Sequence, residues 1–304
     1  MLYPKPPYDL ALLLQVLTRY LHPITDRVYQ GAYWRALYIG DSLVLARVES
    51  TGTPDAPALD VYTTPAAVDR PVLEAALTRL LGLGDNFSAF FLAVQEEDAT
   101  LWPLIEPLRG LRWPRTPTVF EALMVTIVEQ QIAWTAAQKA LRWLVEWGGN
   151  SIETDEQTFY AFPTPKQIAA ATIETFVPLK ITFRRMRLMI DIAQQVTSGR
   201  LDVERLREMP SHEAYAALTS IKGVGHWTAS WTMTRALGAA HNYVGHNDVA
   251  LQAAVNHYFH GGQGRKSGEQ TIETFARYGD FAGLAAHYTI LRWVLDRYEA
   301  RSEG

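Results

Sequence analysis

The feature that most restricts the possible folds is a glycine-containing turn between two segments of helical hydrophobic pattern. The segments are residues 211–219 and 227–237, and Ile221-Lys-Gly-Val-Gly225 lies between them. Two glycines allow positive φ angles and let the backbone approach a ligand without a Cβ in the way. The second helix would then present unpaired N–H groups and its positive dipole end. The pattern predicts a helical hairpin that binds a phosphate, although an ordinary turn without a ligand fits it equally well.

The first hundred residues have a mixed pattern of helices and strands. Residues 9–21 have helical periodicity, whereas residues 33–48 alternate in two runs around Gly40-Asp41, a plausible two-residue hairpin turn. Residues 58–63 predict a further strand, and Pro71 predicts the first turn of a helix. We therefore expect an antiparallel sheet with helices on one face.

The pattern becomes almost entirely helical after a linker with two prolines at residues 110–117. Capping boxes, in which Ser or Thr is followed three residues later by Glu or Gln, are expected to open helices at Thr118, Thr164 and Ser267. Typical helix lengths then predict roughly ten short helices beyond the linker. The fold class expected from these patterns is α+β, with an N-terminal antiparallel β-sheet and helices followed by an all-α part.

The composition indicates an ordered globular protein without cysteine chemistry. The chain is 48% hydrophobic, yet no apolar run approaches the about 18–20 residues needed to cross a bilayer. Because there is no Cys, disulfides, thiolate nucleophiles, Cys-type zinc sites and iron–sulfur clusters are excluded. The first residues lack the arrangement of a signal peptide, so we expect a cytoplasmic protein without membrane partners.

The distribution of charge is uneven. Residues 1–100 carry 7 Lys and Arg against 12 Asp and Glu, whereas residues 101–304 carry 21 against 20. The net charge of −4 argues against a general nucleic-acid binder. Two short basic clusters, within residues 109–115 and 180–187, allow one basic face that contacts DNA, but solvated helix faces explain such clusters as well.

Several stretches together resemble the helix-hairpin-helix superfamily of DNA glycosylases, and the resemblance covers nearly the whole chain. Its strongest parts are Phe120–Ile132 and Leu218–Asp248, and Tyr160–Pro165 and Arg184–Arg187 also fall where the family has similar sequence. The N-terminal part and the sequence Gly-Val-Gly-His-Trp-Thr-Ala are most similar to the DNA-3-methyladenine glycosylase II type. The resemblance implies an enzyme that binds double-stranded DNA, flips out an alkylated purine and hydrolyses its N-glycosidic bond to leave an abasic site.

The resemblance also implies a domain organisation. Residues 1–108 would form an N-terminal α/β sheet domain, and residues 109–304 a helical glycosylase core of two subdomains with the hairpin at about 211–237. Two other functions remain open: a non-catalytic DNA-binding protein that uses the same hairpin, and an enzyme of this fold that acts on oxidised or deaminated bases. We expect a monomer.

Asp248 occupies the position of the family's catalytic aspartate. A carboxylate beside C1′ would stabilise the oxocarbenium character that develops on the deoxyribose when the base departs, and could orient or deprotonate water. Asp248 is also well placed to cap a helix over residues 249–258, and the two roles are compatible.

Trp227 stands where family members that also cut the strand carry a Schiff-base lysine, so the resemblance implies a monofunctional enzyme. Lys222, the nearest lysine, would instead contact phosphate or solvent. Trp227 and Trp231 are one helical turn apart and, with Trp293, are candidates for the walls of a base pocket, since electron-rich rings stack well on a cationic purine. Core packing is the alternative for all three tryptophans.

The resemblance assigns the remaining site residues. Gln131 would insert into the duplex in place of the flipped base, unless it is merely a solvated loop residue. The DNA backbone would be bound by Gly223, Val224, Gly225 and His226. In this family the hairpin carbonyls can hold a sodium or potassium ion, which here would lie at Thr219, Ile221 and Gly223.

No other cofactor is expected. The histidines 241, 246, 257 and 260 have no His-Glu-x-x-His arrangement and no cysteine beside them, so a zinc site is not expected.

Overall fold

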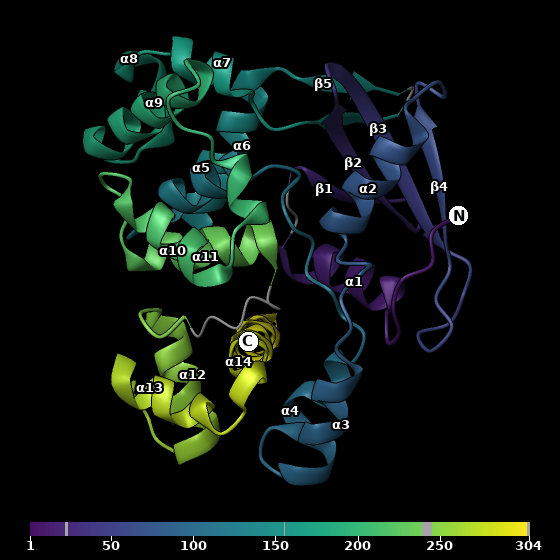
Figure 1. Cartoon of the computed structure of the whole chain (residues 1–304), viewed down its shortest axis with the longest axis vertical. Helices are drawn as coiled ribbons and strands as arrows, with labels where there is room; N and C mark the ends of the chain where they lie inside the picture. The colour runs from purple at the N-terminus through teal and green to yellow at the C-terminus, as the bar shows by residue number, and fades with distance from the viewer. Residues whose placement is uncertain (22–23, 155, 239–244, 303–304) are drawn as a thin grey trace.

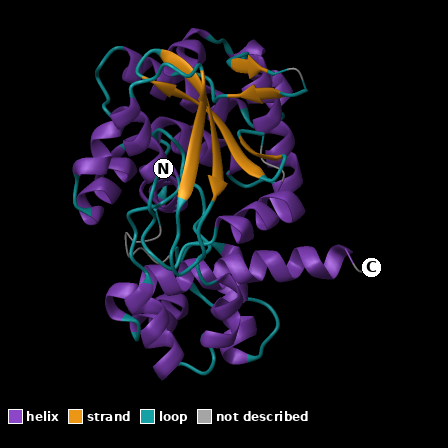
Figure 2. Ribbon diagram, turned by 90° about the vertical axis from the view of Figure 1, so that its right-hand side faces the viewer, coloured by secondary structure: helices purple, strands orange, loops and turns teal. Residues whose placement is uncertain are grey.

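The computed structural model describes residues 1–21, 24–154, 156–238 and 245–302. A four-stranded antiparallel sheet lies beside two groups of helices, which confirms the α+β class (Figure 1). Figure 2 shows the sheet toward one end of the molecule and, at the other, a layer of helices that includes the C-terminal helix α14. Within the described ranges, no helix has both the length and the apolar character that a membrane span requires.

The sheet has the strand order β1-β2-β3-β4, and all its pairs are antiparallel. The strands are β1 (Asp26–Tyr29), β2 (Ala32–Ile39), β3 (Ser42–Ser50) and β4 (Leu59–Thr64). Ile39 pairs with Ser42 across Gly40-Asp41, so the predicted two-residue hairpin turn is confirmed. Gly40 has φ of 59°, a left-handed conformation that glycine adopts without strain.

Both faces of the sheet are covered, because alternate side chains of β2 and β3 enter two different hydrophobic clusters. Tyr33, Leu37 and Val44 face helices α1 (Leu10–Val16) and α2 (Arg70–Leu80). A short helical segment of π type, Leu17–Leu21, continues α1.

The opposite face of the sheet packs against a second hairpin, which corrects the expectation of an all-helical part after residue 108. Its strands are β5 (Ser151–Glu153) and β6 (Thr158–Tyr160). Phe159 is buried and stacks on Trp34 of β2 with ring centroids 5.0 Å apart. Three-residue strands are too short to show an alternating pattern, so only this tertiary contact reveals them.

Two short helices, α3 (Ser88–Glu97) and α4 (Trp102–Ile105), complete the N-terminal part. Ten α-helices follow in the described part of the chain beyond the linker, in agreement with the expected number. They are α5 (Val119–Glu129), α6 (Trp134–Gly148), α7 (Pro165–Ala170), α8 (Ile173–Phe176), α9 (Phe183–Thr197), α10 (Ser211–Ser220), α11 (His226–Leu237), α12 (Val249–His260), α13 (Gly268–Ala276) and α14 (Ala282–Ser302).

The hydrophobic interior is divided between distant parts of the sequence. The largest cluster combines residues 2–111 with residues 251–295, a second lies within residues 119–237, and the third is the small cluster on the opposite face of the sheet. Phe90 and Phe91 of α3, for example, contact Tyr288 of α14 with ring centroids 5.8 and 5.4 Å apart. Helices α3 and α4 therefore lie beside α14, at the opposite end of the molecule from the sheet (Figure 1). The domain boundary at residue 108 stays a prediction.

The structure confirms two capping boxes and corrects the third. At Thr164 and Ser267 both reciprocal hydrogen bonds form. At Thr118 the hydroxyl accepts from the N–H of Glu121, but the carboxylate of Glu121 lies 2.5 Å from the guanidinium of Arg35 instead of returning to the cap. Glu121 and Arg35 are 5% and 1% exposed, so a buried ion pair joins α5 to the sheet.

The two basic clusters are not uniform surface patches. Arg112 is buried with its guanidinium 4.0 Å from the ring of Phe87. Arg185 is buried as well and donates to the carbonyl oxygens of Val128 and Gln130. These two arginines therefore support the fold, whereas Arg184 and Arg187 of the second cluster are exposed.

Candidate active site

The predicted hairpin is present, and α10 and α11 are joined by residues 221–225. Only one of its glycines needs glycine's conformational freedom. Gly223 has φ of 96°, and a Cβ at this position would lie 3.0 Å from the side chain of Leu188 on α9. Gly225 has φ of −92° and open space where a Cβ would be, so it does not use the positive φ that glycine allows.

The hairpin presents an exposed edge of backbone. Gly225 is the N-cap of α11 and supplies no side-chain cap, and Lys222, Gly223 and His226 are exposed beside it. Val224 differs, because its side chain is buried and its N–H donates to the carbonyl of Ile221 at 2.9 Å. The cation at the carbonyls of Thr219, Ile221 and Gly223 stays a prediction.

We expect Gly223→Ala to lower the free energy of unfolding by about 1–2 kcal/mol, since a side chain at this left-handed position is strained and meets Leu188. Gly225→Ala is the matched control and should cost clearly less, because Gly225 has a negative φ and open space for a Cβ and loses only the modest N-cap preference for Gly over Ala. Urea denaturation of both variants measures the difference. Equal stabilities for the two variants would contradict the conformational argument.

Asp248 is the N-cap of α12, as the capping interpretation predicted. Its Oδ1 accepts from the backbone N–H groups of Ala250 and Leu251 at 2.8 and 3.0 Å. Its Oδ2 accepts from the indole N–H groups of Trp227 and Trp231, both at 2.9 Å. Four donors therefore fix the carboxylate, which is 8% exposed, in one orientation.

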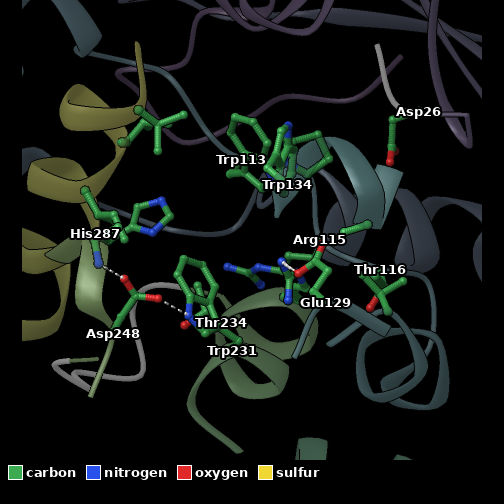
Figure 3. A pocket seen from close by; sticks show the side chains of 18 of the residues that line it. Asp26, Trp113, Arg115, Thr116, Glu129, Trp134, Trp231, Thr234, Asp248 and His287 are labelled. Atoms are coloured by element: carbon green, nitrogen blue, oxygen red, sulfur yellow. Dashed lines mark hydrogen bonds and ion pairs between the residues drawn. The ribbon is translucent and has the colours of Figure 1, made fainter. Parts of the chain in front are cut away.

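This carboxylate borders a cavity of about 720 Å³ between the hairpin, the sheet domain and α14. The side chains around it come from distant parts of the chain (Figure 3). The cavity lining includes Trp113, Trp134, Trp227, Trp231, His287 and Trp293. A concave site with several aromatic walls is suited to a flat organic ring.

The three predicted pocket tryptophans all line this cavity, in different ways. Trp227 and Trp231 lie with ring centroids 6.4 Å apart and both point their N–H groups at Asp248. Trp293 packs against His257 and Tyr258 and lies under the guanidinium of Arg297, with 4.9 Å between that group and the ring centroid.

Sequence reasoning missed three further lining residues: Trp113, Trp134 and His287. Trp134 is 41% exposed and follows the loop of Gln131, so its place in the sequence beside that loop could have identified it as a site residue. Trp113 lies in the linker and His287 within the last helix, where local pattern indicates no role. The tertiary fold brings these residues together.

Asp248 differs from every other cavity-lining carboxylate in the described ranges, because it has no cationic partner. The others are all ion-paired: Asp26 and Glu121 with Arg35, Asp85 with Arg115, and Glu129 with Arg235. Burial raises the pKa of Glu129, and the guanidinium of Arg235 opposes this rise. The charge of Asp248 is therefore the one left available for a cationic ligand or transition state.

Gln131 lies in the loop between α5 and α6 with φ of 51° and an exposed side chain. The loop is held on two sides. Arg185 of α9 donates to the carbonyl of Gln130, and the side-chain amide of Gln130 donates to the hydroxyl of Thr228 on α11 at 2.8 Å. A loop that two hydrogen bonds hold and that exposes a glutamine is compatible with insertion into a duplex.

Among the residues that the structure describes, no three or more His, Asp and Glu side chains form a group that could hold a metal ion. His241 lies outside the described residues.

No protein-family model matches the chain, but its sequence and fold are similar to those of several DNA glycosylases. A DNA-3-methyladenine glycosylase of Bacillus subtilis is 32% identical over 153 residues, which are half of this chain and half of that protein. DNA-3-methyladenine glycosylase 2 of Escherichia coli is 25% identical over 231 residues, covering 76% of this chain and 78% of that protein. The solved 3-methyladenine DNA-glycosylase of Archaeoglobus fulgidus superposes with a TM-score of 0.81 and 25% identity, over 98% of each chain.

A more distant likeness concerns the fold alone. An 8-oxoguanine glycosylase/lyase of Clostridium acetobutylicum, in complex with double-stranded DNA, has a TM-score of 0.72 and 17% identity over 98% of this chain and 93% of that one. The hairpin, the capping aspartate and these likenesses agree with one another: the chain is similar in sequence and fold to DNA glycosylases of the helix-hairpin-helix superfamily. Within the superfamily it resembles the DNA-3-methyladenine glycosylase II type.

Proposed function

We propose that this protein is a monofunctional DNA glycosylase that flips alkylated purines of the 3-methyladenine or 7-methylguanine type out of double-stranded DNA and excises them. The observation that carries the proposal is the carboxylate of Asp248, which four N–H groups hold without a cationic partner in the described ranges, beside an aromatic cavity. An alkylated purine is cationic and leaves readily, so a site that stabilises positive charge on the sugar can suffice.

The hydrogen bonds of Asp248 favour one of its two possible catalytic roles. Four N–H groups occupy the acceptor positions of its two oxygens. A base that removes a proton from water needs a free lone pair, whereas electrostatic stabilisation of an oxocarbenium ion does not. We therefore assign Asp248 the electrostatic role, with Trp227 and Trp231 as positioning residues that also form part of the pocket wall.

Other observations support the remaining parts of the proposal. The names of the relatives from Bacillus subtilis, Escherichia coli and Archaeoglobus fulgidus favour alkylated purines as substrates. No lysine lies among the described residues that line the cavity, which favours hydrolysis without a Schiff base. Gly223, Gly225 and His226 would contact the DNA backbone, and Gln131 would fill the space of the flipped base. A cytoplasmic monomer is the proposed form.

The test is an excision assay on a panel of duplexes, each with one alkylated, deaminated or oxidised base. We expect release of alkylated purines, and strand breaks only after treatment with alkali, since hydrolysis leaves an intact abasic strand. Strand breaks without alkali would contradict the monofunctional mechanism. Preferred release of an oxidised or deaminated base would overturn the substrate, and binding without any release would favour a non-catalytic hairpin protein.

A further inference from the structure

The cavity lining includes a histidine, His287, whose ring has no hydrogen-bond partner in the part of the chain that the structure describes. His287 lies on α14, and Figure 3 shows its imidazole pointing into the cavity on the same side as Asp248. No hydrogen bond joins this ring to any residue in the described ranges, and its one ring contact is with the neighbouring Tyr288. The side chain is half-buried, so its ring nitrogens are available to a ligand that enters the cavity.

The imidazole is uncharged at neutral pH. Burial, together with the positive charge of Arg115, lowers the pKa of His287 to about 4. A neutral imidazole carries one N–H donor and one nitrogen acceptor, and the tautomer decides which nitrogen has which role. Unlike a protonated histidine, it does not repel a cationic base.

We propose that His287 recognises the flipped purine by a hydrogen bond to its exocyclic group at position 6. This inference rests on the proposed function and names the residue that reads the base. Adenine presents an N6 amino donor and guanine an O6 acceptor, so a ring that can donate or accept serves both bases by a change of tautomer. The aromatic walls of the cavity favour a flat ring. His287 then favours a purine that carries a polar group at position 6.

The experiment compares His287→Phe, which keeps an aromatic ring, with His287→Gln, which keeps an uncharged donor and acceptor. His260→Phe is the matched control, because His260 is exposed on α12 and does not line the cavity. Single-turnover excision is measured on duplexes containing 3-methyladenine or 7-methylguanine, together with binding of free 3-methyladenine by calorimetry. Thermal denaturation checks that each variant is folded.

We expect His287→Phe to lower both the excision rate and the affinity for the free base by about tenfold, the value of one hydrogen bond. His287→Gln should stay within about threefold of the wild type, and the control should be unchanged. Wild-type rates in His287→Phe, or a loss in His287→Gln alone, would show that the ring only packs and would overturn the inference. A wild type that releases neither base would overturn the proposed function, and the assignment of His287 with it.

Discussion

Asp248→Asn is expected to bind lesion-containing duplex like the wild type while releasing the base about a thousand times more slowly. The asparagine oxygen can still accept from Ala250 and Leu251, and Asn is as good an N-cap as Asp, so α12 should keep its start. The negative charge that would face the sugar is lost. A factor of a thousand corresponds to about 4 kcal/mol of transition-state stabilisation, typical of a preorganised electrostatic group.

Single-turnover excision and a binding titration on the same duplex measure the two effects separately. Asp280→Asn is the control, because Asp280 is exposed and lies outside the cavity lining. Trp227→Phe should give an intermediate loss, since it removes one of the two indole donors to Oδ2 and keeps an aromatic ring. Equal excision by Asp248→Asn and the wild type would remove the catalytic assignment.

Arg35→Met is expected to lower the free energy of unfolding by about 3–5 kcal/mol. Arg35 is 1% exposed and pairs with Asp26 at 2.9 Å and with Glu121 at 2.5 Å. Removing the guanidinium leaves two buried or partly buried carboxylates without a cation between the sheet and α5. The desolvation cost of such charges is large, and burial already raises the pKa of Glu121.

Arg70→Met is the matched control for urea denaturation. Arg70 also pairs with a carboxylate, Glu74, but both side chains are about 40% exposed, and an exposed pair contributes less than about 1 kcal/mol. Adding Glu121→Gln to Arg35→Met should recover part of the loss, because it removes one uncompensated charge. Equal losses in Arg35→Met and Arg70→Met would show that the buried pair does not stabilise the fold.

The structural elements that local chemistry defines were predictable. The hairpin turn at Gly40-Asp41, the helical hairpin around Gly223 and the N-cap at Asp248 each depend on residues within a few positions of one another. The conformations of such turns and caps follow from the φ preference of glycine and from side-chain acceptors near free N–H groups. The same local sequences carried the family resemblance.

The tertiary structure decided which residues far apart in the sequence interact with one another. Glu121 occupies the Glu position of a capping-box sequence, yet it pairs with Arg35, 86 positions away. A cation stabilises a buried carboxylate more than a backbone N–H group does. Arg185 lies in a basic cluster of the sequence that is typical of a surface, yet it is buried and donates to the carbonyl of Gln130 in the loop of Gln131. His287 reaches the cavity only because α14, α11 of the hairpin and the linker line the same space.

By itself, then, the amino-acid sequence determined the hairpin, the capping aspartate and most helix starts, since each of these arises from short-range backbone geometry. The tertiary structure alone decided that two indoles hold Asp248, that it is the carboxylate without a cation in the described cavity lining, and that an uncharged histidine lies nearby. The physical reason is that charge compensation and burial depend on every neighbour in space, and those neighbours come from segments far apart along the chain.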